Sequence, residues 1–204
     1  MKKILLMGAI AFGIFNFNLV ARAEILPVVH ISDENSQVLR SETKKVTTFD
    51  DSLRKLIDDM KDTMSSENNE QSEGVGLAAP QIGKDLKIFV VKLDSGFQEF
   101  INPEMLEQSE EKSISVEGCI SVPDLIGMVK RSNNVKIQAL NKNGEKFVLE
   151  LSGFDAYVVS HELDHLNKIL FTDVAEAVVD IKGLDETQIQ TKVLEALMQI
   201  MNKK

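Results

Sequence analysis

The chain has 204 residues, of which 43% are hydrophobic. It is therefore long enough for one compact domain with a sizeable core and too short for two comfortable ones. Its formal net charge is -9, with acidic residues spread along the chain. This charge argues against a nucleic-acid partner, because phosphate neutralisation requires clustered Lys and Arg, and it suits a small neutral or peptide substrate.

Residues 1–23 have the layout of a secretory signal peptide. Lys2 and Lys3 precede an apolar run, and Ala21–Ala23 has the small-x-small form of a cleavage site. The apolar run is short for a membrane span. We expect cleavage to leave residues 24–204 as a single exported domain, monomeric and without stable membrane insertion. The alternatives are an uncleaved membrane anchor and a cytoplasmic protein.

The next part of the chain predicts one helix between two irregular stretches. Residues 25–46 are expected to form loop and short strand. Between Asp50 and Met64, apolar residues recur at three- and four-residue steps, and Asp50 or Asp51 can cap the first turn. The stretch Ser65–Glu73 contains no apolar residue, which is typical of a surface loop.

Strand patterns dominate the middle of the chain. Short apolar or alternating runs occur at Lys87–Leu93, Phe97–Asn102 and Val135–Leu140. The pair Asn143-Gly144 between the last of these runs and Phe147–Leu151 predicts a β-hairpin. Two helices are expected to follow, one ending near Leu166 and a C-terminal one from Glu186 to Met201. The order of elements predicts an α+β fold with a mainly antiparallel sheet.

The segment His161-Glu162-Leu163-Asp164-His165 predicts a metal site on a helix. Two His four residues apart point the same way, so both rings can reach one divalent metal with Glu162 beside its open position. The chain contains three His in total, and two of them have this spacing. His30 has no such partner and is expected to be structural or exposed.

A catalytic metal site needs a third protein ligand, for which the chain offers two candidates. Glu186 follows His165 at a distance typical of some metalloproteases. Cys119, the lone cysteine, lies in Glu117-Gly118-Cys119-Ile120-Ser121. A thiolate ligand would explain a single Cys in an exported chain, although a buried structural Cys is the plainer reading. The residues alone leave this choice open.

A third segment, Gly74 to Gly83, is rich in small residues and contains Gln81. It suits a strand edge against which a substrate backbone lies, with the Gln81 amide as a donor. A tightly packed turn into the next strand would have the same composition.

Taken together and in chain order, the three segments resemble the signature motifs of the peptide deformylase family, whose members remove the N-terminal formyl group from new polypeptides. The matching stretches are Gly74–Gln81, Glu117–Ser121 and His161–His165. The resemblance implies a deformylase-like α+β fold around the helix that carries His-Glu-x-x-His. It also implies ferrous iron, or zinc, nickel or cobalt in its place, bound by Cys119, His161 and His165.

The same resemblance implies roles for further residues. Glu162 would be the general base, and the Gln81 side chain and the Ile120 backbone N–H would meet the oxyanion. Glu117 would pair with Arg131, although both could be solvated charges. The N-formylmethionyl peptide would bind along Gly74, Val75 and Gly76 and against Phe154, Tyr157 and Val158. The four apolar or aromatic positions of that set could instead be core, namely Val75, Phe154, Tyr157 and Val158.

The chain departs from the family pattern at a few positions. Ser160 and Lys168 stand where Gln and Gly are usual, and Ile126 lies where some members have an Arg that holds substrate carbonyls. Two rival functions remain at this point: a zinc endopeptidase that uses His161, His165 and Glu186, and a non-catalytic homologue that binds metal or formyl-peptides outside the cytoplasm.

Overall fold

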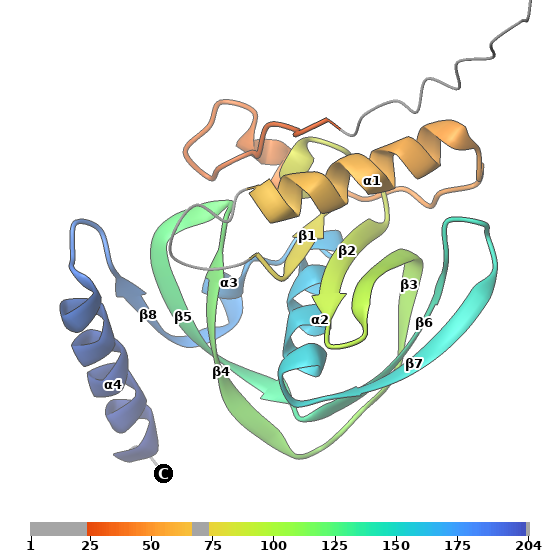
Figure 1. Ribbon diagram of the computed structural model, residues 1–204. Helices are drawn as coiled ribbons and strands as arrows, with labels where there is room; N and C mark the ends of the chain where they lie inside the picture. Colours follow the sequence, from red (N-terminus) through yellow and green to blue (C-terminus); the bar gives the residue numbers. More distant parts are fainter. Residues whose placement is uncertain (1–23, 67–73, 203–204) are drawn as a thin grey trace, which may run out of the picture.

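The computed structural model describes residues 24–66 and 74–202 (Figure 1). The predicted signal peptide and most of the predicted loop Ser65–Glu73 lie outside the described residues. The helices are η1 (Ser36–Arg40), α1 (Asp51–Ser66), η2 (Ala79–Ile82), α2 (Gly153–Leu166), α3 (Phe171–Val174) and α4 (Glu186–Asn202). The strands are β1 (Gly76–Ala78), β2 (Ile88–Leu93), β3 (Gly96–Gln108), β4 (Lys112–Cys119), β5 (Val122–Ser132), β6 (Asn134–Leu140), β7 (Lys146–Ser152) and β8 (Ala175–Asp180).

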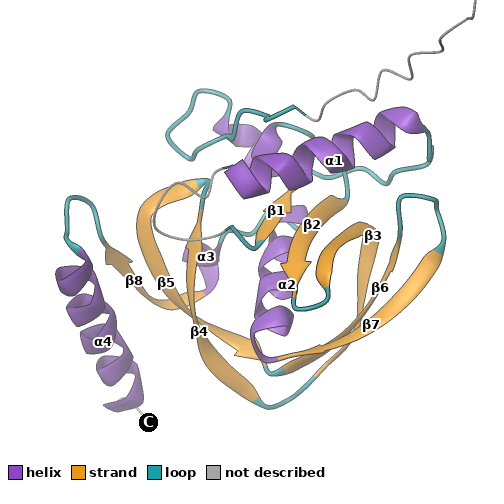
Figure 2. Cartoon of the chain, in the orientation of Figure 1, coloured by secondary structure: helices purple, strands orange, loops and turns teal. Residues whose placement is uncertain are grey.

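Two antiparallel sheets surround α2 (Figure 2). The larger sheet has the order β1-β2-β3-β6-β7, and the smaller has the order β4-β5-β8. Helix α2 contacts β1, β2, β6 and β7 of the larger sheet and β5 of the smaller one. The predicted α+β fold with a central helix is therefore confirmed, with two antiparallel sheets in place of the single one expected. The strands β1 and β4 each stand at the edge of a sheet.

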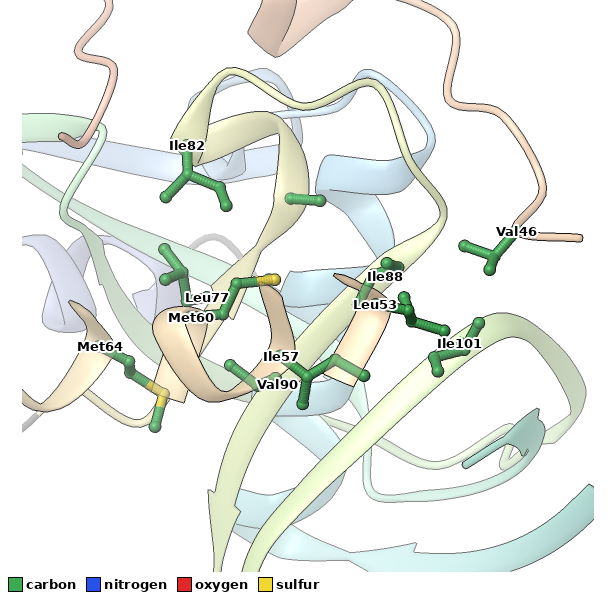
Figure 3. Close-up of a cluster of buried hydrophobic side chains, with 11 residues drawn as sticks. Val46, Leu53, Ile57, Met60, Met64, Leu77, Ile82, Ile88, Val90 and Ile101 are labelled. Carbon is green, nitrogen blue, oxygen red and sulfur yellow. The ribbon is translucent and has the colours of Figure 1, made fainter. Parts of the chain in front are cut away.

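Helix α1 covers the outer face of the larger sheet. Its N-terminus is capped as predicted, because Asp50 Oδ1 accepts a hydrogen bond from the Leu53 N–H at 3.0 Å. The apolar face of α1 is buried against side chains from β1, β2 and β3, as Figure 3 shows. The central members of this cluster are Leu53, Ile57, Met60, Met64, Leu77, Ile88, Val90 and Ile101.

The opposite face of the same sheet packs against α2. Phe89 and Phe100 stack with ring centroids 4.6 Å apart. Val159 of α2 is fully buried in the cluster that contains both rings. Burying large apolar side chains on both sides of one sheet fixes α2, and with it the His-Glu-x-x-His segment, at the centre of the molecule.

Some element boundaries differ from the predictions. The strands β4, β5 and β8 were not predicted; Gly118, Pro123 and Gly127 interrupt the apolar pattern of β4 and β5. Strand β3 runs to Gln108, because its second half pairs with β6 although its side chains are largely exposed. The expectation of a short strand within residues 25–46 was wrong: this stretch contains η1 and a single isolated bridge between Lys44 and Leu86.

Helix α4 lies at the margin of the molecule beside β8 (Figure 1). Its inner side packs Val193, Leu197 and Ile200 against β5 and β8 residues such as Met128 and Val179. None of the helices within residues 24–66 and 74–202 is long and apolar enough to cross a membrane.

Candidate active site

Helix α2 carries the two histidines of the predicted metal site on the same side. His161 and His165 are one helical turn apart, and their ring centroids are separated by 5.0 Å. His165 is 1% exposed and Glu162 is 4% exposed, which is unusual for ionisable side chains. The helix therefore places three polar groups where an ordinary core helix would bury apolar ones.

Cys119 approaches these histidines from the other sheet. It ends β4, where the chain turns so tightly that Cys119 pairs with Val122 of β5. Its Sγ lies 3.3 Å from His165 Nε2. The ligand atoms of Cys119, His161 and His165 all lie within 4.8 Å of one another. One thiolate and two imidazoles in this arrangement fit a divalent transition metal with one position open for water.

Glu186 has a different environment from Cys119. It begins α4, and its carboxylate accepts a hydrogen bond from Gln190 Nε2 at 3.2 Å. Within the described residues it is not part of the group of potential metal ligands that contains both His161 and His165. The structure thus favours Cys119 as the third ligand, and the alternative left open by the sequence is not supported.

An ionic cluster stands behind His161. Arg131 donates two hydrogen bonds to Glu117, at 2.8 and 2.9 Å, and a third to Asp164 at 2.5 Å. Glu117 Oε2 also lies 2.9 Å from His161 Nδ1. Burial alone would raise the pKa of Glu117, but Arg131 and His161 outweigh it and bring the pKa to about 2. Ionised Glu117 therefore accepts the Nδ1 proton of His161, which leaves Nε2 free to bind a metal.

Two buried side-chain atoms of α2 lack a hydrogen-bond partner in the part of the chain that the structure describes. Within the described residues, Glu162 Oε2 and His165 Nδ1 are buried and make no hydrogen bond. Burial raises the pKa of Glu162 to about 7. A buried carboxyl oxygen without a hydrogen-bond partner is costly to a fold, so its presence beside three side chains that could hold a metal indicates a role in chemistry.

Gly76 explains how Glu162 fits beside the edge strand. A Cβ at this position would lie 2.3 Å from Glu162 Oε1 and 2.7 Å from its carboxyl carbon. Any other side chain at residue 76 would have to displace the carboxylate. The glycine-rich segment thus forms the expected strand edge, as β1, and makes room for Glu162.

Gln81 is held in η2, directly after β1. Its Oε1 accepts a hydrogen bond from the Ala78 N–H at 2.7 Å, which fixes the orientation of the amide. Its Nε2 then points to Cys119 Sγ at 3.4 Å and to Ser121 Oγ at 3.3 Å. The distance to Ser121 Oγ is long for a hydrogen bond to oxygen, and sulfur is a weak acceptor, so the amide retains the capacity to donate to a substrate oxygen.

A pocket of about 530 Å³ opens in front of these groups. Its lining includes Gln81, Cys119, Ile120, His161 and Glu162. The six residues expected along the substrate also line it, namely Gly74, Val75, Gly76, Phe154, Tyr157 and Val158. The apolar positions were expected to be either pocket or core, and Val158 is both. Its side chain lines the pocket and is also buried in the cluster between α2 and the larger sheet.

Sequence reasoning missed several residues of the site. Asp164 was treated only as part of the motif, yet it is a second acceptor for Arg131. The pocket wall formed by Val116, Leu125 and Ile181 was also missed, because it comes from the strands that were not predicted and from the residue after β8. Ile126, the position that departs from the family pattern, lies in the same wall.

Comparisons with known proteins agree with this geometry. The sequence profile of the family described as polypeptide deformylase matches residues 25–180. The peptide deformylase of Acetivibrio thermocellus is 40% identical over 167 residues, which cover 82% of this chain and 92% of that protein. Peptide deformylase 1 of Bacillus subtilis is 46% identical over 139 residues, which cover 67% of this chain and 83% of the relative.

Solved structures give the same result. The crystal structure of peptide deformylase from Thermotoga maritima matches with a TM-score of 0.70 and 38% identity, covering 76% of this chain and 99% of that one. The enzyme from Synechococcus elongatus, in complex with actinonin, matches with a TM-score of 0.69 and 32% identity, covering 84% of this chain and 88% of that one. The profile match, the relatives and the shared fold together show that this chain belongs to the peptide deformylase family.

Proposed function

We propose that this chain is an iron(II)-dependent deformylase, which hydrolyses the formyl amide at the N-terminal formylmethionine of peptides and releases formate. The observation that carries the proposal is the buried carboxyl group of Glu162, whose Oε2 has no hydrogen-bond partner among the described residues, beside the Cys119, His161 and His165 side chains. These groups open into a cleft that can hold a peptide. The chemistry is that of the family to which the chain belongs; the individual roles are inferred from the site.

The cleft suits the end of an extended peptide. The sheet-edge strands β1 and β4 both contribute residues to its lining, so a substrate backbone can lie along Gly74–Gly76 and across from Val116. Phe154, Tyr157 and Val158 provide an apolar wall for the methionine side chain. The formyl group would then reach the metal-binding end of the cleft, beside Glu162 and Gln81.

A divalent metal held by Cys119 Sγ and the two imidazoles would supply an activated water and Lewis-acid polarisation of the formyl oxygen. Glu162, with its pKa raised by burial, accepts the proton of the attacking water. The Gln81 amide and the Ile120 backbone N–H stabilise the oxyanion that develops on the former formyl oxygen. Glu162 then returns the proton to the leaving amine, so that formate and a free amino terminus are produced.

The choice of ferrous iron follows the resemblance of the donor set to that of the family. Zinc, nickel and cobalt accept the same combination of one sulfur and two nitrogen donors. Ferrous iron on a thiolate is open to oxidation, which would favour the redox-inactive zinc in an oxidising compartment. Metal content after anaerobic and aerobic purification distinguishes these cases.

We further propose that residues 1–23 direct export and are removed. The composition of the segment supports this, and so does the environment of Glu24: its backbone N–H donates to Asp59 Oδ1 at 2.7 Å. Cleavage after Ala23 would convert this N–H into an α-ammonium group beside a buried carboxylate, which favours an ion pair. N-terminal sequencing of the protein from an exported fraction tests the cleavage site.

The test of the proposed function is release of formate by the chain from Glu24 onward, purified anaerobically with ferrous iron. We expect formyl-Met-Ala-Ser to be deformylated and acetyl-Met-Ala-Ser to remain intact. No internal peptide bond should be cleaved in either peptide. A fully metal-loaded protein that releases no formate, or one that cuts internal bonds, would overturn the proposal.

A further inference from the structure

The stretch Val29–Thr43, which we name the N-terminal arm, contacts all three segments that build the candidate active site. The arm includes η1 and is the red and orange stretch near α1 in Figure 1. Sequence analysis gave it no role. Its hydrogen bonds, however, reach the Gln81 segment, the Cys119 segment and the end of α2, which lie far apart in the sequence.

The first two contacts use the backbone of the arm. The Val29 N–H donates to the carbonyl oxygen of Gln81 at 2.7 Å. Two residues later, the Ile31 N–H donates to the carbonyl oxygen of Ser121 at 2.9 Å. The arm thus joins the residue that carries the oxyanion donor to the turn that directly follows Cys119. Val29 is buried, which shields the first of these bonds from water.

The other contacts use side chains and reach the C-terminal end of α2. Thr43 is buried, and its Oγ1 donates to the carbonyl oxygen of Leu166 at 2.8 Å. Arg40 Nη1 donates to the carbonyl oxygen of Lys168 at 2.9 Å, and the guanidinium also pairs with Asp173. Both carbonyl groups lie within three residues of His165, whose ring supplies one of the metal donors.

The direct contacts between the side chains of the site run through Cys119 Sγ, the atom that a metal would engage. Gln81 Nε2 lies 3.4 Å from Cys119 Sγ, and Cys119 Sγ lies 3.3 Å from His165 Nε2. His165 Nδ1 has no hydrogen-bond partner among the described residues, so no bond on that side of the ring fixes its orientation. Metal donors need such support, because ring orientation and ligand separation set affinity.

We propose that the N-terminal arm is a positioning element that keeps the Gln81 segment, the Cys119 segment and α2 in place relative to one another. Thr43 is its buried anchor at the helix of His165. The hydrogen bonds of the arm to these segments end on backbone carbonyl oxygens and not on the metal-donor atoms, so the arm acts through the backbone of its partners. The inference rests on the metal centre proposed above and adds a dependence of metal retention on residues far from the ligands in sequence.

The experiment measures loss of cobalt(II) to a chelator from the cobalt-loaded protein, together with the absorption of the cobalt–thiolate bond and the thermal unfolding of the metal-free protein. Thr43→Val removes the hydroxyl donor at nearly constant volume. We expect metal loss to be about tenfold faster, with an altered thiolate absorption, as for changes in groups that support metal ligands. Thr43→Ser should restore the wild-type rate.

Thr63→Val is the matched control. Thr63 is also buried, and its Oγ1 donates to the carbonyl oxygen of Asp59 at 2.7 Å and accepts from the Leu26 N–H at 2.8 Å. Neither partner lies in the Gln81 segment, the Cys119 segment or α2. We expect this variant to unfold at a lower temperature while it retains cobalt as the wild type does.

Four outcomes decide the matter. Wild-type metal retention in Thr43→Val would overturn the proposal, and so would equally fast loss from Thr63→Val, because the effect would then be one of general stability. If Thr43→Val does not fold, Arg40→Gln, at a half-exposed position, replaces it, with an expected acceleration of about threefold from the loss of a partly exposed ion pair. An unchanged rate in Arg40→Gln would then overturn the proposal. Failure of the wild type to bind cobalt through Cys119 would instead refute the metal centre itself.

Discussion

The two long helices of the second half of the chain, α2 and α4, have similar lengths and opposite characters. Helix α4 has 17 residues, of which Ile200 is buried, and its Leu194, Met198 and Met201 are at least 50% exposed. Helix α2 has 14 residues and buries six of them, including Glu162 and His165. The longer helix lies at the margin and the shorter one at the centre (Figure 1).

This difference indicates which helix of the fold carries the reactive side chains. A regular amphipathic period, as in α4, marks a helix that packs on one side. A helix enclosed on several sides is expected to be apolar all round, so buried ionisable groups within it need a reason beyond folding. In α2 the reason we propose is the metal centre, and the predictions below test whether the two helices differ in this way.

The largest effect is expected from the third metal ligand. Cys119→Ala removes the thiolate that meets the two His of α2, and metal binding should be lost, with activity reduced at least about a hundredfold, since even supporting groups contribute 10- to 100-fold. Glu186→Gln, at the start of α4, should retain metal and activity. Metal analysis and formate release on both variants measure this. Loss of metal from Glu186→Gln but not from Cys119→Ala would support the zinc endopeptidase alternative.

A smaller but still large effect is expected at Gly76. A Cβ at this position would lie 2.3 Å from Glu162 Oε1, so Gly76→Ala must shift the carboxylate. A displacement of this kind lowers the rate by about a hundredfold while the metal is retained. Gly118→Ala, where an added Cβ meets no atom within 4 Å, should lose much less activity. Equal losses in the two variants would show that crowding of Glu162 is not the cause.

The contrast in burial predicts a difference in stability. Val159→Ala removes two methyl groups from the fully buried α2 cluster and should lower the free energy of unfolding by about 2 kcal/mol. Leu194→Ala changes an α4 side chain that is 53% exposed and should stay within about 0.5 kcal/mol of wild type. Urea unfolding followed by circular dichroism measures both. A larger loss at Leu194 would indicate that the outer side of α4 is covered in solution.

The smallest effect concerns the residue that follows α2. Lys168 has a φ of 68°, in the left-handed region that favours glycine, and it stands where the family usually has Gly. Lys168→Gly should relieve this conformation and stabilise the protein by about 0.5 to 1 kcal/mol after the entropy of glycine is subtracted. Thermal unfolding should show a rise in Tm. A fall would mean that the Lys168 side chain contributes more than its backbone conformation costs.

How much of the structure could be predicted from the sequence depended on how far apart in the chain the interacting residues are. Helix α1, its Asp50 cap and the pairing of β6 with β7 across Asn143-Gly144 follow from patterns within a few residues, and they were predicted nearly to the boundary. The site motif on α2 was equally local, because the spacing of His161 and His165 is a property of one helix.

The features that were missed depend on long-range pairing. Strands β4 and β5 contain glycines and a bulge between Glu117 and Cys119, so no clear alternation marks them. Asp164 reads as a surface charge until β5 places Arg131 beside it. The choice between Cys119 and Glu186 likewise needed either the family resemblance or the fold, since only packing brings β4 against α2.

The central claim is that Glu162 acts as the general base of a metal-dependent deformylase. The most direct test compares formate release from formyl-Met-Ala-Ser by wild type and Glu162→Ala, with metal content measured on the same samples. We predict full metal occupancy in both proteins and loss of nearly all activity in the variant. A metal-loaded Glu162→Ala protein that releases formate at the wild-type rate would contradict the account.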